Sequence, residues 1–330
     1  MISDVSPLRR HVCLIINPIS GTASKLRMIP AIARRLDKEG ISFDIHRTEG
    51  PGHATELASG AARSGFYDAV IACGGDGTVN ETACGLTGTP TPMGIIPAGS
   101  GNGLARHLGI PVDVRRSIGI IAENNIIDAD FGTAAGTPFF CTFGTGFDAA
   151  VSERFARRKR RGIVSYLKST IDEFVKFKPE EYVIETDDTV LTDRAFLVVC
   201  CNASQYGNNA FIAPQASVTD GLIDVAIVHA GNIASHALVG LDLLTGFIGK
   251  NALVNMIRVK SATIHRNKAG IAHIDGDPRF MPADIDVRCH PGAIRMLAPT
   301  RSSQFKPVIT PVSLFFRDCF LAATGLWRNK

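Results

Sequence analysis

Residues 68–81 read Asp68-Ala-Val-Ile-Ala-Cys-Gly-Gly-Asp-Gly-Thr-Val-Asn-Glu81, and this stretch decides the fold. The apolar run Ala69–Cys73 is typical of a buried strand, and the spacing of Val79–Leu86 predicts a helix packed against it. Between them, Gly74-Gly-Asp-Gly-Thr78 has three glycines in four positions. Glycine allows positive φ and has no Cβ to keep a bulky anion from the backbone N–H groups. The turn, followed by a helix N-terminus, therefore predicts a phosphate site.

Asp76 needs an explanation inside such a turn, because a carboxylate repels phosphate unless it faces a metal ion, a proton donor or a nucleophile. One interpretation is structural: Asp76 caps the helix after a tight strand-to-helix turn. The functional interpretation is that Asp76 faces a metal ion, a proton donor or a nucleophile at the phosphate site. The sequence does not separate these roles.

Length and composition indicate an ordinary globular protein. A length of 330 residues favours two domains. Of these residues 45% are hydrophobic and 20% are charged, so the chain has enough apolar side chains for an ample core. The net charge of +4 is too small to imply nucleic acid, although it permits contact with an acidic membrane surface. The eight cysteines form no Cys-x-x-Cys pair, and the first ten residues lack the apolar core of a signal peptide. We therefore expect reduced thiols and a cytoplasmic protein.

Two further loops resemble the first in their setting. The apolar run Val12–Ile16 leads into Asn17-Pro-Ile-Ser-Gly21, and Met93–Ile96 leads into Pro97-Ala-Gly-Ser-Gly-Asn102. Each loop is followed by a helical pattern, and strands that alternate with helices predict a parallel, doubly wound sheet. Ligands bind at the carboxyl ends of the strands in such sheets. All three loops should lie on that edge, which strengthens the phosphate interpretation.

The pattern changes after residue 130, where short β-type runs with Gly, Pro, Asn and Asp turns predict an antiparallel sandwich. The fold class is thus α/β: a Rossmann-like nucleotide domain over residues 1–130, followed by a β-sandwich over 131–298. The remaining residues 299–330 form an amphipathic pattern. This tail either packs back on the protein or lies in a membrane interface.

Three polar features of the second half have two interpretations each. Asp275-Gly-Asp277 is either a β-turn or a pair of catalytic carboxylates. Asp220 begins a turn but could also bind Mg²⁺ together with nearby carbonyl oxygens. The basic residues in 154–161 form either a solvated helix end or a contact with acidic lipid.

These motifs, taken in order, resemble the diacylglycerol kinase catalytic-domain family, which includes bacterial lipid kinases, sphingosine kinases and ceramide kinases. The resemblance is carried by Asn17-Pro-x-Ser-Gly21, Gly74-Gly-Asp-Gly-Thr-x-Asn-Glu81, Pro97-x-Gly-Ser-Gly-Asn102, Gly146-Phe-Asp-Ala149, Gly162-Ile-Val-Ser-Tyr166, Ala213-Pro-x-Ala216, Asp220-Gly-Leu-Ile-Asp224 and Asp275-Gly-Asp277. It spans nearly the whole chain.

The resemblance implies a nucleotide domain and a lipid domain, with ATP in the cleft between them and transfer of its γ-phosphate to a hydroxyl of diacylglycerol or a related lipid such as a sphingoid base. It implies Mg²⁺ held by the Asp220 side chain and the main-chain oxygens of Ser217 and Leu222. The partner would be a lipid substrate at a membrane surface, reached by peripheral contact; a homodimer is left open. The nucleotide-binding residues implied are Asn17, Pro18, Ser20, Gly21, Thr48, Gly74, Gly75, Asp76, Gly77, Thr78, Glu81, Gly99, Ser100 and Asn102.

Catalytic roles implied by the resemblance fall on Asp76 and on the Asp275/Asp277 pair, one of which would be the general base. The family has Asp-Gly-Glu where this chain has Asp275-Gly276-Asp277, and three glycines are frequent where this chain has Gly207-Asn208-Asn209. These departures leave the lipid open. The alternatives are a NAD kinase, which shares the Gly-Gly-Asp-Gly-Thr turn, and a catalytically weak regulator that binds lipid or nucleotide.

Overall fold

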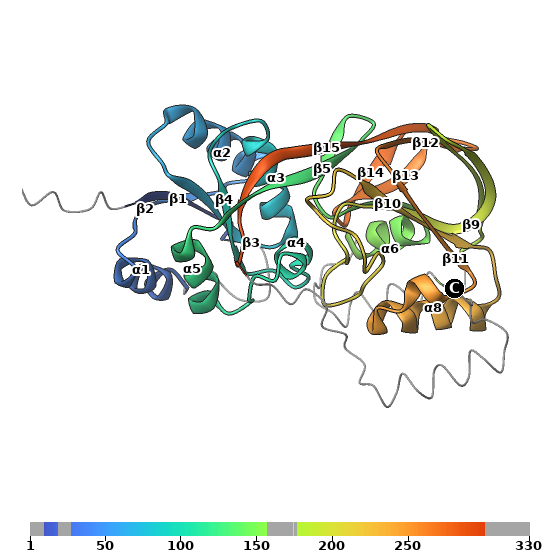
Figure 1. The fold of residues 1–330 in the computed structure, drawn as a ribbon, viewed down its shortest axis with the longest axis horizontal. Coiled ribbons are helices and arrows are strands. Elements are labelled where there is room, and N and C mark those ends of the chain that lie inside the picture. Colours follow the sequence, from blue (N-terminus) through green and yellow to red (C-terminus); the bar gives the residue numbers. More distant parts are fainter. Residues whose placement is uncertain (1–9, 19–27, 157–173, 175–176, 301–330) are drawn as a thin grey trace, which may run out of the picture. The chain divides into compact units, whose positions relative to one another are not determined.

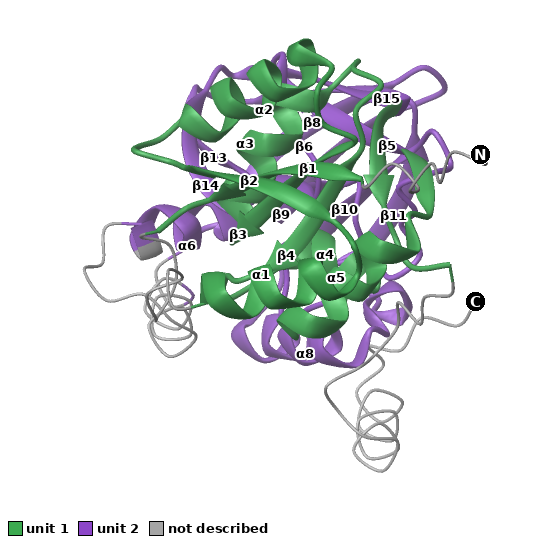
Figure 2. Ribbon diagram, turned by 90° about the vertical axis from the view of Figure 1, so that its left-hand side faces the viewer, with its two compact units in different colours: residues 1–128, 293–302 green, residues 129–292, 303–330 purple. Residues whose placement is uncertain are grey.

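The computed structural model describes residues 10–18, 28–156, 174 and 177–300. The chain forms two compact units: unit 1 comprises residues 1–128 and 293–302, and unit 2 comprises 129–292 and 303–330 (Figure 2). One difference from the sequence analysis is the assignment of residues 293–298, which pack with unit 1 although we expected them in the sandwich. Among the residues expected to bind nucleotide, Ser20 and Gly21 lie outside the described residues, and so does the tail from residue 301.

Unit 1 is built on a parallel sheet whose three inner strands are buried along nearly all of their length, whereas the edge strand, residues 42–47, is only partly buried (Figure 1). Its order is β15-β4-β3-β1-β2, with parallel pairing throughout. Only the end of β15 takes part, through the pairing of Met296 with Met93. The bounds are β1 His11–Ile16, β2 Ser42–Arg47, β3 Ala69–Gly74, β4 Met93–Pro97 and β15 Asp284–Leu297. The predicted Rossmann-like architecture is confirmed.

Helices pack on both faces of this sheet. On one face α1 and α5 supply Ile32, Leu36, Ile118 and Ile121 to a core shared with β1 and β3. Elsewhere α2 and α3 pack so closely that a Cβ added to Gly85 would stand 2.5 Å from the carbonyl oxygen of Thr55. The bounds are α1 Ile29–Lys38, α2 His53–Ser64, α3 Asp76–Leu86, α4 Gly103–His107 and α5 Val114–Glu123.

Unit 2 is the antiparallel sandwich that the second half of the sequence predicts. Its strands follow the order β14-β13-β7-β9-β8-β12-β15, and β10 pairs with both β9 and β11. Two strands, β5 and β15, pair with each other and run from one unit into the other. The bounds are β5 Ile126–Ala134, β6 Thr137–Phe139, β7 Thr142–Gly146, β8 Glu180–Thr186, β9 Val190–Cys201, β10 Ile223–His229, β11 Val254–Val259, β12 Ser261–Arg266, β13 Gly270–Ile274 and β14 Asp277–Met281.

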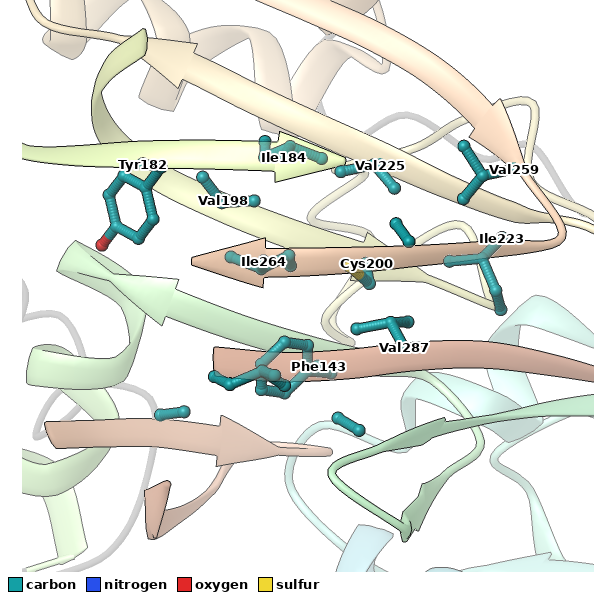
Figure 3. Packing of buried hydrophobic residues seen from close by; sticks show 14 of the residues in the cluster. Phe143, Tyr182, Ile184, Val198, Cys200, Ile223, Val225, Val259, Ile264 and Val287 are labelled. Carbon is teal, nitrogen blue, oxygen red and sulfur yellow. The ribbon is translucent and has the colours of Figure 1, made fainter. Parts of the chain in front are cut away.

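The core of unit 2 lies on both faces of β9 and β10. Val198 and Cys200 point into the interior of the sandwich with Phe143 and Ile264 (Figure 3). Their neighbours Val199 and Cys201 belong to a second cluster. Side chains of a strand alternate between the faces of its sheet, so a strand buried on both sides is apolar at every position. The second cluster includes residues of α6 Phe147–Ala156 and α8 Ile233–Thr245, and a short 3-10 helix, η2 Ile248–Lys250, follows α8.

Candidate functional site

The carboxyl edge of the sheet in unit 1 brings the expected loops together. Ile16 of β1 lies beside Arg47 and Cys73, and Gly74 of β3 lies beside Pro97. Backbone hydrogen bonds continue past the strand ends: the N–H of Asn17 donates to Cys73, that of Thr48 to Ile16, and that of Ala98 to Gly74, at 3.4, 3.0 and 2.7 Å. The three loops and the buried Thr48 therefore leave the sheet at one level.

Two of the loops touch through glycines. A Cβ added to Gly99 would stand 2.5 Å from the Cα of Gly75, and one added to Gly75 would stand 3.2 Å from the Cα of Gly99. Gly74 has no room either, because the Thr78 side chain occupies the place of its Cβ. Glycine is required here because backbone packs on backbone, and the close packing sets the position of the amides that follow.

Asp76 has a structural role that the sequence analysis did not anticipate. Its Oδ2 accepts the N–H of Asn102 at 2.9 Å, and its Oδ1 accepts the N–H of Gly103 at 2.6 Å. Asn102 is the N-cap residue of α4 and has φ 54°. The carboxylate thus caps α4, rather than the helix α3 in which Asp76 itself lies. An acidic residue in a phosphate turn is explained in part by this link between the second and third loops.

The first turn of α3 offers donors for an anion. Gly75 is its N-cap, so the cap residue brings no side chain to the amides of the first turn. The hydroxyl of Thr78 is buried and has no hydrogen-bond partner among the described residues. Backbone amides at a helix N-terminus and an unpaired hydroxyl suit phosphate oxygens.

The other residues that we expected to bind nucleotide lie at different places in unit 1. Asn102 holds the third loop in shape, because its side chain accepts the N–H of Gly99 and donates to the carbonyl of Gly99, both at 2.9 Å. Ser100 is exposed on that loop, and Gly77 and Pro18 are half-buried. Glu81 lies further along α3, where its carboxylate accepts the N–H of Ala54 at the start of α2, at 3.3 Å. That contact gives Glu81 a structural position.

Arg106 is a cation at this edge that the sequence analysis did not select. Its Nε donates to the carbonyl of Gly101 in the third loop at 3.0 Å, and the side chain is half-buried. The neighbouring His107 is buried, which lowers the pKa of its imidazole to about 4. His107 is therefore neutral near pH 7, so Arg106 is the charged residue of this pair. Its place four residues after the Pro97–Asn102 loop was the available signal.

In unit 2 the two carboxylates of the 275–277 turn are unlike. Asp275 accepts three backbone N–H groups, from Phe140, Cys141 and Thr142, at 2.9, 2.8 and 2.9 Å. It therefore fixes the chain entering β7. Asp277 opens β14, at the edge of the sheet, and its side chain is exposed. The structure thus separates a carboxylate that holds the backbone from one that faces solvent.

The turn around Asp220 concentrates negative charge. Arg258 donates to Asp224 at 2.9 Å and lies 4.0 Å from Asp220. Burial raises the pKa of Asp224, although the hydrogen bond and charge of Arg258 oppose that shift. Asp130 joins from β5, accepting the N–H groups of Gly221 and Gly292, each at 2.7 Å. Arg258 thus faces two carboxylic acids, and a third, Asp130, contacts the same turn through backbone N–H groups.

Two family models match the chain in succession. The diacylglycerol kinase catalytic domain matches residues 11–134, and the YegS C-terminal NAD kinase beta sandwich-like domain matches residues 141–298. The two matches cover most of unit 1 and most of unit 2.

Curated relatives match this chain over nearly their whole length. A diacylglycerol kinase of Mycobacterium tuberculosis is 30% identical over 317 residues, covering 88% of this chain and 97% of that protein. A diacylglycerol kinase of Staphylococcus saprophyticus is 27% identical and covers 82% and 90%. Among solved structures, a diacylglycerol kinase from Bacillus anthracis has a TM-score of 0.68 at 20% identity, covering 88% of this chain and 97% of its own. At that identity the structural match supports the fold.

Proposed function

Because the chain belongs to the diacylglycerol kinase family and is an ATP-dependent lipid kinase, we propose that its acceptor is the free hydroxyl of diacylglycerol. The observation that carries this assignment is the match, over both units, to relatives that bear this name. ATP is the phosphate donor expected of the family.

In this mechanism the edge of unit 1 binds the phosphates of ATP. Phosphoryl transfer depends mostly on alignment and on neutralisation of charge. The amides at the start of α3 and the Thr78 hydroxyl would contact phosphate oxygens, and Arg106 would offset their charge. Asp76 would keep the third loop in register with the glycine turn.

Asp277 is our candidate for the general base. A base must reach the acceptor hydroxyl, and the exposed Asp277 can do so more readily than Asp275, which accepts three N–H groups. An ordinary carboxylate is ionised at neutral pH. It can orient the hydroxyl and take its proton as the new P–O bond forms and the bond to ADP breaks.

Magnesium fits the turn around Asp220 by charge and ligand type. Mg²⁺ prefers oxygen ligands, and Asp220 with the main-chain oxygens of Ser217 and Leu222 supplies them. The turn also carries more carboxylic acids than cations. When bound, the ion would neutralise this charge and hold the turn.

We expect Mg²⁺ to raise the melting temperature of the protein and Asp220→Asn to abolish that rise. An ion at ten times its Kd stabilises a protein by about 1.4 kcal/mol, or about 3–6 °C for a domain of this size. The measurement is thermal unfolding with and without Mg²⁺. Asp187→Asn, at an exposed turn of the same unit, is the control. An equal Mg²⁺ response in all three proteins would refute this site.

Membrane contact is proposed for the edge strand β14. Phe280 is 73% exposed and Arg279 beside it is also exposed, three and two residues from Asp277. An exposed aromatic ring and an exposed cation on the strand that carries the proposed base suit the surface of an anionic bilayer. In the described part of the chain, no helix is long and apolar enough to span a membrane.

Phe280→Ser should weaken binding to vesicles of phosphatidylglycerol and phosphatidylcholine by about tenfold, because an inserted aromatic side chain contributes about 1.5–3 kcal/mol. Sedimentation of the vesicles measures the bound fraction. The control is Val190→Ser, which removes another exposed apolar side chain of unit 2, 61% exposed at the start of β9. Equal weakening by both variants would exclude a specific role for β14.

Transfer of label from γ-labelled ATP tests the function. The purified protein is given Mg²⁺ and mixed micelles carrying diacylglycerol, monoacylglycerol, sphingosine, ceramide or phosphatidylglycerol, with NAD in a separate reaction. We expect label in diacylglycerol, and none with Asp277→Ala. Label in another lipid would change the acceptor, and label in NAD alone would favour the NAD kinase alternative. ATP binding without any transfer would favour the regulator.

A further inference from the structure

A buried group of polar side chains lies next to the 275–277 turn of unit 2. The Nε2 of His273 lies 2.9 Å from the Oδ2 of Asp148, and both side chains are buried, at 1% and 9% exposed. The hydroxyl of Tyr206 donates to the same oxygen at 3.1 Å. The N–H of Ala149 donates to the other oxygen at 2.8 Å. Three donors thus satisfy the Asp148 carboxylate.

The second nitrogen of His273 reaches the turn itself. The backbone N–H of Gly276 donates to Nδ1 at 3.4 Å. A nitrogen that accepts a hydrogen bond carries no proton, so the imidazole is neutral with its proton on Nε2, facing Asp148. Asp148 therefore selects the tautomer that can hold Gly276.

The His273 ring and the Asp148 carboxylate pack directly against the backbone of Gly144. A Cβ on Gly144 would overlap both the Asp148 carboxylate and the His273 ring, so the strand beside them approaches without a side chain. Packing and two hydrogen bonds thus fix one rotamer and one tautomer of a buried histidine.

That acceptor is one of several contacts that hold the turn, since the N–H of Asp275 also donates to the carbonyl of Thr142 at 2.8 Å. Asp275 and Gly276 both have positive φ, 48° and 88°, and Ile274 pairs with Asp277 across the hairpin. This is a type I′ turn, and rotation of the peptide between its two central residues would convert it towards type II′. The N–H of Gly276 belongs to that peptide. His273 therefore holds a peptide whose rotation would change the turn that precedes β14, where Asp277 lies.

We propose that His273, oriented by Asp148, is a positioning residue for Asp277 in the kinase reaction. It acts by accepting the Gly276 N–H and does not itself take the substrate proton. This role rests on the proposed function of Asp277 as the general base. Nothing in the sequence motifs pointed to His273.

Two replacements separate the hydrogen bonds of His273. Glutamine places an amide donor near the position of Nε2 and keeps the contact with Asp148, but it offers no acceptor to Gly276. Asparagine places an oxygen near the position of Nδ1 and keeps the contact with Gly276, but it leaves Asp148 with one donor fewer. The control is His265→Gln, on β12 of the same unit.

We expect His273→Gln to lower kcat about tenfold at unchanged KM for both substrates and near-normal melting temperature, since a misplaced catalytic group can cost up to about 100-fold. His273→Asn should recover most of that kcat, assayed well below its lowered melting temperature. NMR of the imidazole nitrogens at the assay pH should show the neutral form with hydrogen on Nε2.

Three results would overturn the proposal: unchanged kcat in His273→Gln, a kcat in both variants that falls only with the folded fraction, or a proton on Nδ1. Asp277→Asn is assayed in parallel. If it keeps its kcat, the assignment of the base fails. If it loses kcat while His273→Gln does not, the positioning role alone fails.

Discussion

Asp277→Asn should lower kcat by about 10²–10⁴-fold, the usual contribution of a positioned general base, and leave the melting temperature unchanged. The side chain is exposed at the start of an edge strand, so its removal breaks little packing. Asparagine keeps the size of the side chain and loses its ability to accept the proton. Single-turnover transfer to diacylglycerol measures the effect without product release.

Asp275→Asn should have the opposite signature. Its carboxylate accepts three N–H groups, and asparagine must turn an NH₂ group towards at least one of them. An unsatisfied buried group costs about 1–3 kcal/mol, so the melting temperature should fall by several degrees. The exposed Asp187→Asn serves as the control for both variants. Loss of kcat in Asp275→Asn at normal stability, with Asp277→Asn active, would exchange the two roles.

The strands of this protein differ in how far the sequence predicts them. The inner half of β9 is apolar at every position because it is buried on both faces, so its sequence carries a clear strand signal. The edge strand β14 was not expected, since Asp277 and Pro278 are typical turn residues and Phe280 is exposed. An edge strand is held in place by its hydrogen bonds to a neighbouring strand, here β13. Its own residues therefore show little of the apolar pattern by which a strand is predicted.

The candidate site likewise has features that the sequence predicts and features that it does not. The glycine turn and its two neighbouring loops were predicted, because strand, glycines and helix follow one another within a few residues. The contact of Gly75 with Gly99 and the cap of α4 by Asp76 join segments about 25 residues apart. Their existence depends on which strands are adjacent. The roles of Asp275 and His273 depend on backbone N–H groups, which no side-chain pattern reveals.

Asp76→Asn should lower kcat/KM for ATP by about 10²–10³-fold, comparable to loss of a preorganised group at a charged transition state. The carboxylate accepts two N–H groups at the start of α4 and aligns the third loop with the glycine turn. The asparagine side chain has one oxygen and one NH₂ group, so it can accept only one of these two N–H groups. Steady-state kinetics and calorimetric titration with ATP measure the loss.

The matched control is Asp113→Asn. Asp113 also caps a helix of unit 1, accepting the N–H of Arg116 at 2.9 Å, but that helix, α5, follows none of the three loops. Asparagine is about as good an N-cap as aspartate, so stability and activity should both persist. Gly99→Ala tests the loop without removing a carboxylate, because its Cβ would stand 2.5 Å from the Cα of Gly75. If Asp76 acts through loop position, Gly99→Ala must weaken ATP binding as Asp76→Asn does. If instead Asp76→Asn loses kcat while ATP binds normally, the carboxylate takes part in the transfer step itself, at the metal ion or the acceptor hydroxyl.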